Sequence, residues 1–225
     1  MMSASPIDLT TLAAVKQALN VAGTNDDALI QFLITSWSSY FLWRTGCGGQ
    51  DQDYSQSPFA DVCDWSEVYD GNGTWRLFLR NYPVTAVSSL NVNGVVIGAS
   101  SGVGAPGYVI DATGKSVSLR LGGGATGTFS FNSYPGVGYV PGGFFTKGIQ
   151  NVAISYSAGF AETPFDIQWA ANVSVGVQYK RAQRRDQASQ AMGAGAGTIS
   201  FRDWVNPPEA ERVIVAYTRY TRPGS

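Results

Sequence analysis

The clearest pattern in the chain is an apolar stretch from Thr24 to Thr45 whose large side chains recur at three- and four-residue steps. This spacing predicts one long helix, capped by Thr24 or Asn25 and ended by Gly46, which is free to take the left-handed conformation. The apolar face is broad, because Ile30, Ile34 and Phe41 widen the row formed by Leu29, Phe32, Leu33, Trp37 and Tyr40. A helix this apolar must be covered by other helices or by a neighbouring subunit.

The same period of 3.6 predicts three further helices. The first spans 7–19, with Asp8 or Thr10 as its cap, and a short link joins it to the long helix as an antiparallel pair. The next begins at Pro164, with Thr163 as its cap, and ends on a basic cluster that suits the helix dipole: Lys180, Arg181, Arg184 and Arg185. The last follows Pro207 and Pro208.

Between these helices the pattern changes to a period of two, which is typical of strands. Two hairpins are predicted, one turning at 70–73 and one at Asn93–Gly94. Further strands are expected at 108–111, 116–121, 128–132 and 150–156. The chain contains 27 glycines, many of them in the links between these strands. Several short strands at this spacing predict either a sandwich or a small barrel.

The order helix, helix, β block, helix, helix predicts an α+β fold. Both chain ends supply a helical base, and an antiparallel β domain is inserted between them. The expected boundaries are 1–64 for the N-terminal helical pair and a loop, 65–160 for the β domain, and 161–225 for the C-terminal helices and an arm, which pack with 1–46. The polar loop at 47–64 is long enough that we expect it to be functional or mobile.

Composition narrows the function classes. Only 14% of the residues are charged, against about 25% in an average soluble domain, which suggests that partners occupy part of the surface. The net charge of −1 offers no general attraction for nucleic acid. With no histidine, the chain lacks the commonest general base and metal ligand. Cys47 and Cys63 are not spaced as a zinc site, and whether they pair is left open. No apolar run approaches the roughly 20 residues that cross a membrane.

None of the candidate motifs for nucleotide or metal binding is complete. Gly114-Lys115-Ser116 lacks the earlier glycine of a phosphate loop, and the glycines at 102, 104 and 107 are followed by no helix. The acidic residues of the 47–64 loop do not follow a calcium-binding pattern. We therefore expect no enzyme activity, no catalytic residue, no cofactor and no metal.

An aromatic and basic group near the C-terminus is the most suggestive candidate for binding. Trp, Tyr and Arg are the residues enriched at interaction hot spots. The alternative for this group is local core packing with solvated arginines. Its members are Arg202, Trp204, Arg212, Tyr217, Arg219, Tyr220 and Arg222.

Three segments resemble the head–tail connector family of tailed bacteriophages, also called adaptor or head-completion proteins. The first is LTTLAAVKQALNVAGTNDDALIQFLITSWSSYFLWRTG at 9–46, and the second is VYDGNGTWRLFLRNYPVTAVSSLNVNGV at 68–95. The third is the helix from Pro164 with its basic end at 179–186, then a Gly/Ala-rich loop and a last short helix. The β block is larger than in compact helical members of the family.

The resemblance implies a structural protein of the virion neck, assembled in the host cytoplasm. Such subunits form a homo-oligomeric ring, typically of twelve copies, beneath the portal. The ring joins the head to the tail and extends the DNA channel used in genome packaging and ejection. The implied partners are other copies of the chain, the portal protein, tail or stopper proteins, and genomic DNA that passes without sequence-specific binding; no membrane is implied. The C-terminal group named above would dock on the portal. Packing between subunits would use Leu29, Phe32, Leu33, Trp37, Tyr40 and Phe41.

Two alternatives remain open. A neck stopper or tail-completion protein would share the β fold without the paired N-terminal helices. A carbohydrate-binding β module would present exposed Trp and Tyr and would form no ring. A hydrolase with carboxylates assembled in space is the least favoured, because no motif supports it.

Overall fold

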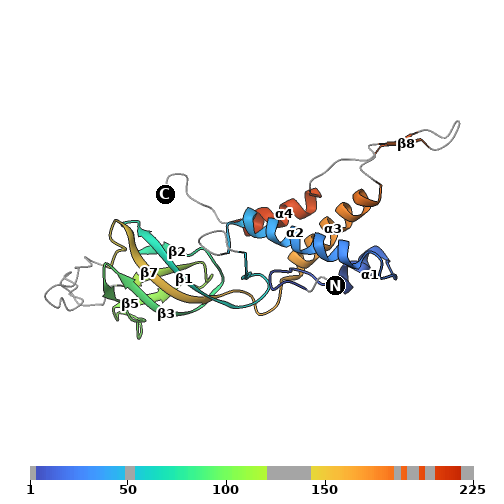
Figure 1. The fold of residues 1–225 in the computed structure, drawn as a ribbon. Helices are drawn as coiled ribbons and strands as arrows, with labels where there is room; N and C mark the ends of the chain where they lie inside the picture. The colour runs from blue at the N-terminus through green and yellow to red at the C-terminus, as the bar shows by residue number, and fades with distance from the viewer. Residues whose placement is uncertain are drawn as a thin grey trace. The chain divides into compact units, whose positions relative to one another are not determined.

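A computed structural model describes residues 4–48, 54–120, 143–184, 189–191, 198–200 and 206–218. The chain divides into two compact units. The helical unit comprises Met1–Cys47, Tyr54–Ala60 and Glu162–Ser225. The β unit comprises Gly48–Asp53 and Asp61–Ala161. Each unit is described by itself below, with the elements labelled in Figure 1.

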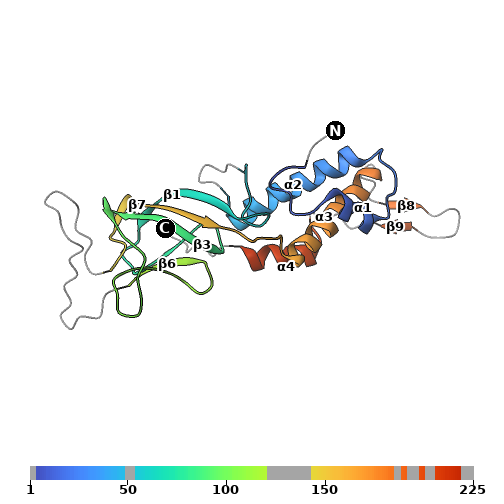
Figure 2. The ribbon, with the colours of Figure 1, turned by 90° about the horizontal axis from the view of Figure 1, so that it is seen from below.

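Both ends of the chain build the helical unit, as the sequence predicts. Its helices are α1 (Leu12–Leu19), α2 (Asp27–Thr45), α3 (Phe165–Gln183) and α4 (Pro208–Tyr217). Helix α3 packs against α1, α2 and α4, and α2 also contacts α1 and α4. The two views in Figures 1 and 2 both show α2, α3 and α4 side by side. The fold class is therefore α+β, with a helical base formed from both chain ends.

The predicted helix ends are partly right. Gly46 ends α2 in the left-handed conformation, and its N–H donates to the carbonyl oxygens of Leu42 and Trp43. The N-cap of α2 is Asp26 rather than Thr24 or Asn25. Helix α3 begins one residue later than expected, because Pro164 occupies the cap position that was assigned to Thr163.

Helix α1 starts at Leu12, not at residue 7, and Asp8 has a different role from the predicted cap. Thr11 caps the helix by accepting a 3.2 Å hydrogen bond from the N–H of Ala14. The Asp8 carboxylate instead accepts hydrogen bonds from Gln31 Nε2 at 2.6 Å and Thr35 Oγ1 at 2.8 Å. Asp8 therefore holds the segment before α1 against α2.

The described end of the polar 47–64 loop carries a buried aromatic anchor. Phe59 is fully buried, with its ring 5.2 Å from that of Phe41 on α2 and 5.7 Å from that of Tyr217 on α4. Both contacts are edge-to-face, the arrangement that aromatic quadrupoles favour. The segment 54–60 thus packs on the helical unit through Phe59.

Two antiparallel sheets form the β unit. The larger has the strand order β1-β7-β3-β4, and the smaller has the order β2-β6-β5. The strands are β1 (Cys63–Gly71), β2 (Arg76–Phe78), β3 (Val84–Val92), β4 (Val95–Val96), β5 (Gly107–Ile110), β6 (Ser116–Arg120) and β7 (Gly148–Ala158). The two sheets are separate in the described residues and do not close into a barrel, so the sandwich alternative is the correct one.

One of the two predicted hairpins is correct. Asn93 and Gly94 have positive φ angles of 52° and 80°, which a tight two-residue turn between β3 and β4 requires. The hairpin predicted at 70–73 is wrong, because β1 pairs with β7 whereas β2 pairs with β6. The chain changes sheets at this point. An Asn72 side chain that accepts hydrogen bonds from the Thr74 N–H and hydroxyl, each at 2.9 Å, stabilises the crossing.

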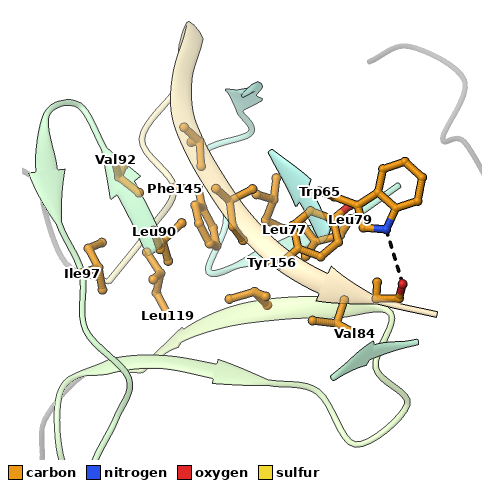
Figure 3. Packing of buried hydrophobic residues seen from close by; sticks show 14 residues of the cluster. Trp65, Leu77, Leu79, Val84, Leu90, Val92, Ile97, Leu119, Phe145 and Tyr156 are labelled. Atoms are coloured by element: carbon orange, nitrogen blue, oxygen red, sulfur yellow. Dashed lines mark hydrogen bonds between the residues drawn. The ribbon is translucent and has the colours of Figure 1, made fainter. Parts of the chain in front are cut away.

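The core of the β unit lies between the two sheets (Figure 3). Its large aromatic side chains are Trp65 and Tyr156 of the larger sheet and Phe145, which precedes β7. Leu77 and Leu119 come from the smaller sheet. Trp65 Nε1 donates to the carbonyl oxygen of Ala158 at 3.4 Å, so the indole is buried with a partner. Buried and exposed residues alternate along β1, because its odd-numbered side chains face this core and its even-numbered ones face away.

Two short strands join α3 to α4. Strand β8 (Ser189–Ala191) pairs with β9 (Thr198–Ser200) in an antiparallel two-stranded sheet. From the sequence, the segment that contains β9 could be either a strand or an extended arm, and the segment that contains β8 is expected to be part of a Gly/Ala-rich loop. The predicted strand at 128–132 lies outside the described residues.

Candidate assembly surfaces

Helix α2 is apolar on two different sides. Its inner side packs in the helical unit through Ile30, Ile34, Trp37 and Phe41, all fully buried. Its other side carries Leu29, Phe32 and Trp43, which are 38%, 54% and 58% exposed. Leu33, Ser36 and Tyr40 lie between them on the same side and are half-buried. We call these six residues the α2 outer face.

The residues predicted to pack between subunits therefore divide into two groups. Leu29, Phe32, Leu33 and Tyr40 belong to the α2 outer face, whereas Trp37 and Phe41 are enclosed within the chain's own core. Trp43 completes the outer face, although the sequence reasoning did not select it. Its signal was present, since Leu29, Ser36 and Trp43 follow one another at seven-residue steps, which keeps them on one side of a helix.

Helix α3 presents a second exposed apolar row. Phe165 and Trp169 are 85% and 48% exposed, and Val173 and Val177 continue the row at four-residue steps. The exposed Lys180 stands at its C-terminal end. We call these five residues the α3 outer face. The α3 outer face was not predicted from the sequence, although the four-residue spacing of Phe165, Trp169, Val173 and Val177 indicates it.

The predicted portal-docking group is only partly within the described residues. Arg212 is exposed on α4. Tyr217 packs against Phe41 and Phe59, and its hydroxyl donates to Asp166 Oδ1 at 3.1 Å. Burial and the Asp166 carboxylate raise the pKa of Tyr217 to about 12. The other members lie outside the described residues: Arg202, Trp204, Arg219, Tyr220 and Arg222.

A polar contact joins the C-terminal end of α2 to the first turn of α4. The Arg44 guanidinium pairs with the Glu211 carboxylate and also donates to the Tyr40 hydroxyl at 2.5 Å. The hydrogen bond to Glu211 is the largest of the effects that raise the pKa of Arg44. Both side chains are partly exposed, so this pair orients the helices more than it stabilises them.

The β unit has an exposed aromatic and basic cluster of its own. The Arg76 guanidinium lies 4.6 Å from the ring centroid of Trp75 and 5.9 Å from that of Phe78. Both aromatic side chains are about half exposed. Trp and Arg are frequent at interaction hot spots, so this cluster is a candidate contact surface.

The described residues carry no arrangement suited to a metal or a membrane. No group of three or more Cys, Asp or Glu side chains within the described ranges is placed to hold a metal ion. Among the helices of the described part, none combines the length and apolarity that crossing a bilayer requires.

Comparison with known proteins identifies the fold. No family model matches the chain, and no curated protein matches it. Among solved structures, it is similar to a chain in the neck of an empty GTA (gene transfer agent) particle computed with C6 symmetry. The TM-score is 0.51 and the identity 15%, with 100% of this chain and 96% of that chain covered. A chain in the neck of a native GTA particle computed with C12 symmetry gives a TM-score of 0.49 at 14% identity, over 100% and 96% of the two chains. The protein thus has a fold that occurs in the neck of a phage-like particle.

Proposed function

We propose that this chain is a structural subunit of a phage neck. It forms an adaptor ring beneath the portal, joins the DNA-filled head to the tail, and extends the DNA channel. The observation that carries the proposal is the α2 outer face, which is a row of large apolar side chains exposed in the single chain. The resemblance of the N-terminal helices to connector proteins supports it, as does the fold shared with a neck chain.

Exposure of the α2 outer face to water is unfavourable for an isolated subunit. No charged residue occurs between Ala28 and Trp43, so no ionic side chain within this stretch favours exposure of the α2 outer face to solvent. Burying one large apolar side chain contributes about 1.5–3 kcal/mol. Leu29, Phe32 and Trp43 together therefore provide a substantial driving force for subunit contact. Depletion of charge with enrichment of aromatic residues is also the composition of interface centres.

In this proposal the parts of the chain have distinct roles. The helical unit forms the ring, which we expect to contain twelve copies. Residues 161–225 supply the arm that reaches the portal, with Arg212 and the C-terminal aromatic and basic residues as its contacts. Genomic DNA passes through the ring without sequence-specific binding, since the chain has a net charge of −1.

The alternatives are less well supported. A stopper or tail-completion protein lacks the paired N-terminal helices that α1 and α2 form here. A carbohydrate-binding module needs an open aromatic ring on which a sugar can stack. Trp75 is the exposed indole of the β unit nearest to that requirement, but the Arg76 guanidinium already lies over its ring.

Negative-stain electron microscopy of the purified chain, alone and mixed with the portal protein, tests the proposal. We expect rings, or an added collar on the portal. Phe32→Asp should abolish them, because it places a charge in the centre of the α2 outer face. Val103→Asp is the matched control, since Val103 is a fully exposed apolar residue of the β unit. A chain that stays monomeric and ignores the portal would overturn the proposal.

A further inference from the structure

We propose that the α2 outer face of one subunit packs, antiparallel, against the α3 outer face of the next subunit. This inference rests on the proposed ring and names its contact. The two faces belong to one unit but are different surfaces, because α2 and α3 pack against each other through their inner sides.

A ring needs this kind of pair. Head-to-tail rings require two different, complementary patches on every subunit, whereas a patch that binds itself closes at two copies. Packing α2 against α2 of a second copy would leave Phe165 and Trp169 in water. Packing α2 against α3 covers both rows at every contact around the ring.

The two faces match in length and composition. From Leu29 to Trp43 the α2 row spans about 21 Å, and from Phe165 to Val177 the α3 row spans about 18 Å, at roughly 1.5 Å per residue. No charged residue occurs between Ile167 and Tyr179, just as none occurs between Ala28 and Trp43. Each row also combines large aromatic side chains with smaller ones, Ser36 on α2 and the two valines on α3, so side chains can interdigitate.

The charges at the ends of the rows select the antiparallel direction. Helix α2 begins at Asp26 and Asp27 and ends at Arg44, whereas α3 begins near Asp166 and ends at Lys180. The antiparallel arrangement places Lys180 beside the acidic start of α2 and Asp166 beside Arg44. The parallel arrangement would bring like charges together. These charges set direction more than affinity, because most of them already have partners within the chain. Asp27 and Arg44 are in ion pairs, and Asp26 and Asp166 accept hydrogen bonds from tyrosine hydroxyls.

Within this direction, the register that pairs the aromatic ends places Trp43 opposite Phe165. Ser36 then lies within one residue, about 1.5 Å along the axis, of Val173, and Leu29 lies equally close to the level of Lys180. The aromatic residues at one end then stack on each other, and the aliphatic part of the lysine covers the leucine at the other end.

Cysteine cross-linking tests the contact in the full-length chain. Ser36→Cys protein is mixed with Val173→Cys protein, alone and together with the portal protein, and oxidised. Disulfide-linked peptides are then identified by mass spectrometry, which separates them from any bond of Cys47 or Cys63. We expect a 36–173 link only in the mixture. Val215→Cys is the control partner for Ser36→Cys. Val215 belongs to α4 and is more exposed than the half-buried Val173, so accessibility alone would favour this pair, yet it should give no link.

A second variant guards against a folding artefact. Trp169 is half exposed, so Trp169→Asp should leave the monomer folded by far-UV circular dichroism while rings are lost. Rings that form without a 36–173 link, or that survive Trp169→Asp, would overturn this inference and leave the proposed ring intact. A 36–36 link from Ser36→Cys alone would also overturn it. Absence of any assembly, with or without portal, would overturn both the contact and the proposed function.

Discussion

The phenol of Tyr156 donates a 2.6 Å hydrogen bond to the buried carboxylate of Glu67, joining β7 to β1 in the core of the β unit. The Tyr69 hydroxyl donates to the same oxygen, and Arg80 Nε lies 3.7 Å from the other. Both phenol oxygens also accept backbone N–H groups, Tyr156 from Asn81 at 3.3 Å and Tyr69 from Arg80 at 2.8 Å. One buried carboxylate therefore orders two strands and the segment that follows β2.

Removing the Tyr156 hydroxyl should be costly, because it takes a donor from a buried negative charge. We expect Tyr156→Phe to lower the free energy of unfolding of the β unit by about 1.5–3 kcal/mol, the range for hydrogen bonds to charged groups. Tyr108→Phe is the control. Its phenol donates to a neutral acceptor, the carbonyl oxygen of Val87 at 2.9 Å, and its loss should cost about 0.5–1.5 kcal/mol. Urea denaturation measures both, and equal effects would contradict the role given to Glu67.

The same network predicts a loss of stability in alkali. Burial is the largest of the causes that raise the pKa values of Tyr69 and Tyr156 above the ordinary value of about 10. Above that pH the unfolded chain releases these protons while the folded chain keeps them, so the unfolded state binds fewer protons. The stabilisation is thus complete below about pH 10 and is lost progressively as the pH rises toward the folded-state values.

The measurement is the urea midpoint between pH 8 and pH 11. We expect the midpoint to fall above about pH 10, and to fall less steeply in Tyr156→Phe, which has one fewer linked proton. Tyr217 adds a similar dependence in the helical unit, so the comparison between the two proteins isolates the β unit. An identical pH profile in the variant would show that Tyr156 is not linked to folding.

The features that local sequence determines were predictable. Gly46 ends α2 because a left-handed residue is needed there, and Asn93–Gly94 forms a turn because both residues tolerate positive φ. The first hairpin was not predictable in the same way. Whether β1 pairs with β2 or with β7, 80 residues away around Asp70, depends on contacts that no local pattern contains.

The assembly surfaces, too, could be predicted only in part from local sequence. The periodicity of α2 indicates that the helix is apolar on more than one side, but it does not say which side the chain covers itself. That depends on α3 and α4, which come more than a hundred residues later. Trp37 and Phe41 thus appeared equivalent to Phe32 in the sequence, although they are buried and Phe32 is not.

Substitution of Phe59 tests how much the segment at 54–60 contributes to the stability of the helical unit. We expect Phe59→Ala to lower the free energy of unfolding of this unit by about 3–5 kcal/mol, because it leaves a cavity between Phe41 and Tyr217. Phe144→Ala, at a 44% exposed position, should cost much less. Thermal unfolding followed by circular dichroism distinguishes the two. A small effect of Phe59→Ala would mean that residues 54–60 contribute little to the stability of the helical unit.

Substitution of Gly71 tests how closely the end of β1 approaches the segment that precedes β7. A Cβ atom at this position would lie 1.7 Å from the carbonyl oxygen of Thr146, a backbone atom that cannot rotate away. It would also lie 2.8 Å from Asn151 Oδ1, which accepts a 2.7 Å hydrogen bond from the Gly71 N–H. Gly71→Ala must therefore move a strand, and we expect a loss of about 3 kcal/mol, at the upper end for overpacking.

The control is Gly98→Ala, because a Cβ at Gly98 meets no atom within 4 Å. We expect that change to leave the unfolding free energy nearly unaltered, or to raise it slightly by restricting the unfolded chain. Hydrogen exchange adds a local measurement, since the amides at the Gly71–Gly148 end of the β1–β7 pair should lose protection in Gly71→Ala before those at the Cys63–Ala158 end. Uniform loss along the pair would indicate that the glycine governs the whole sheet, and unchanged protection would contradict the close approach itself.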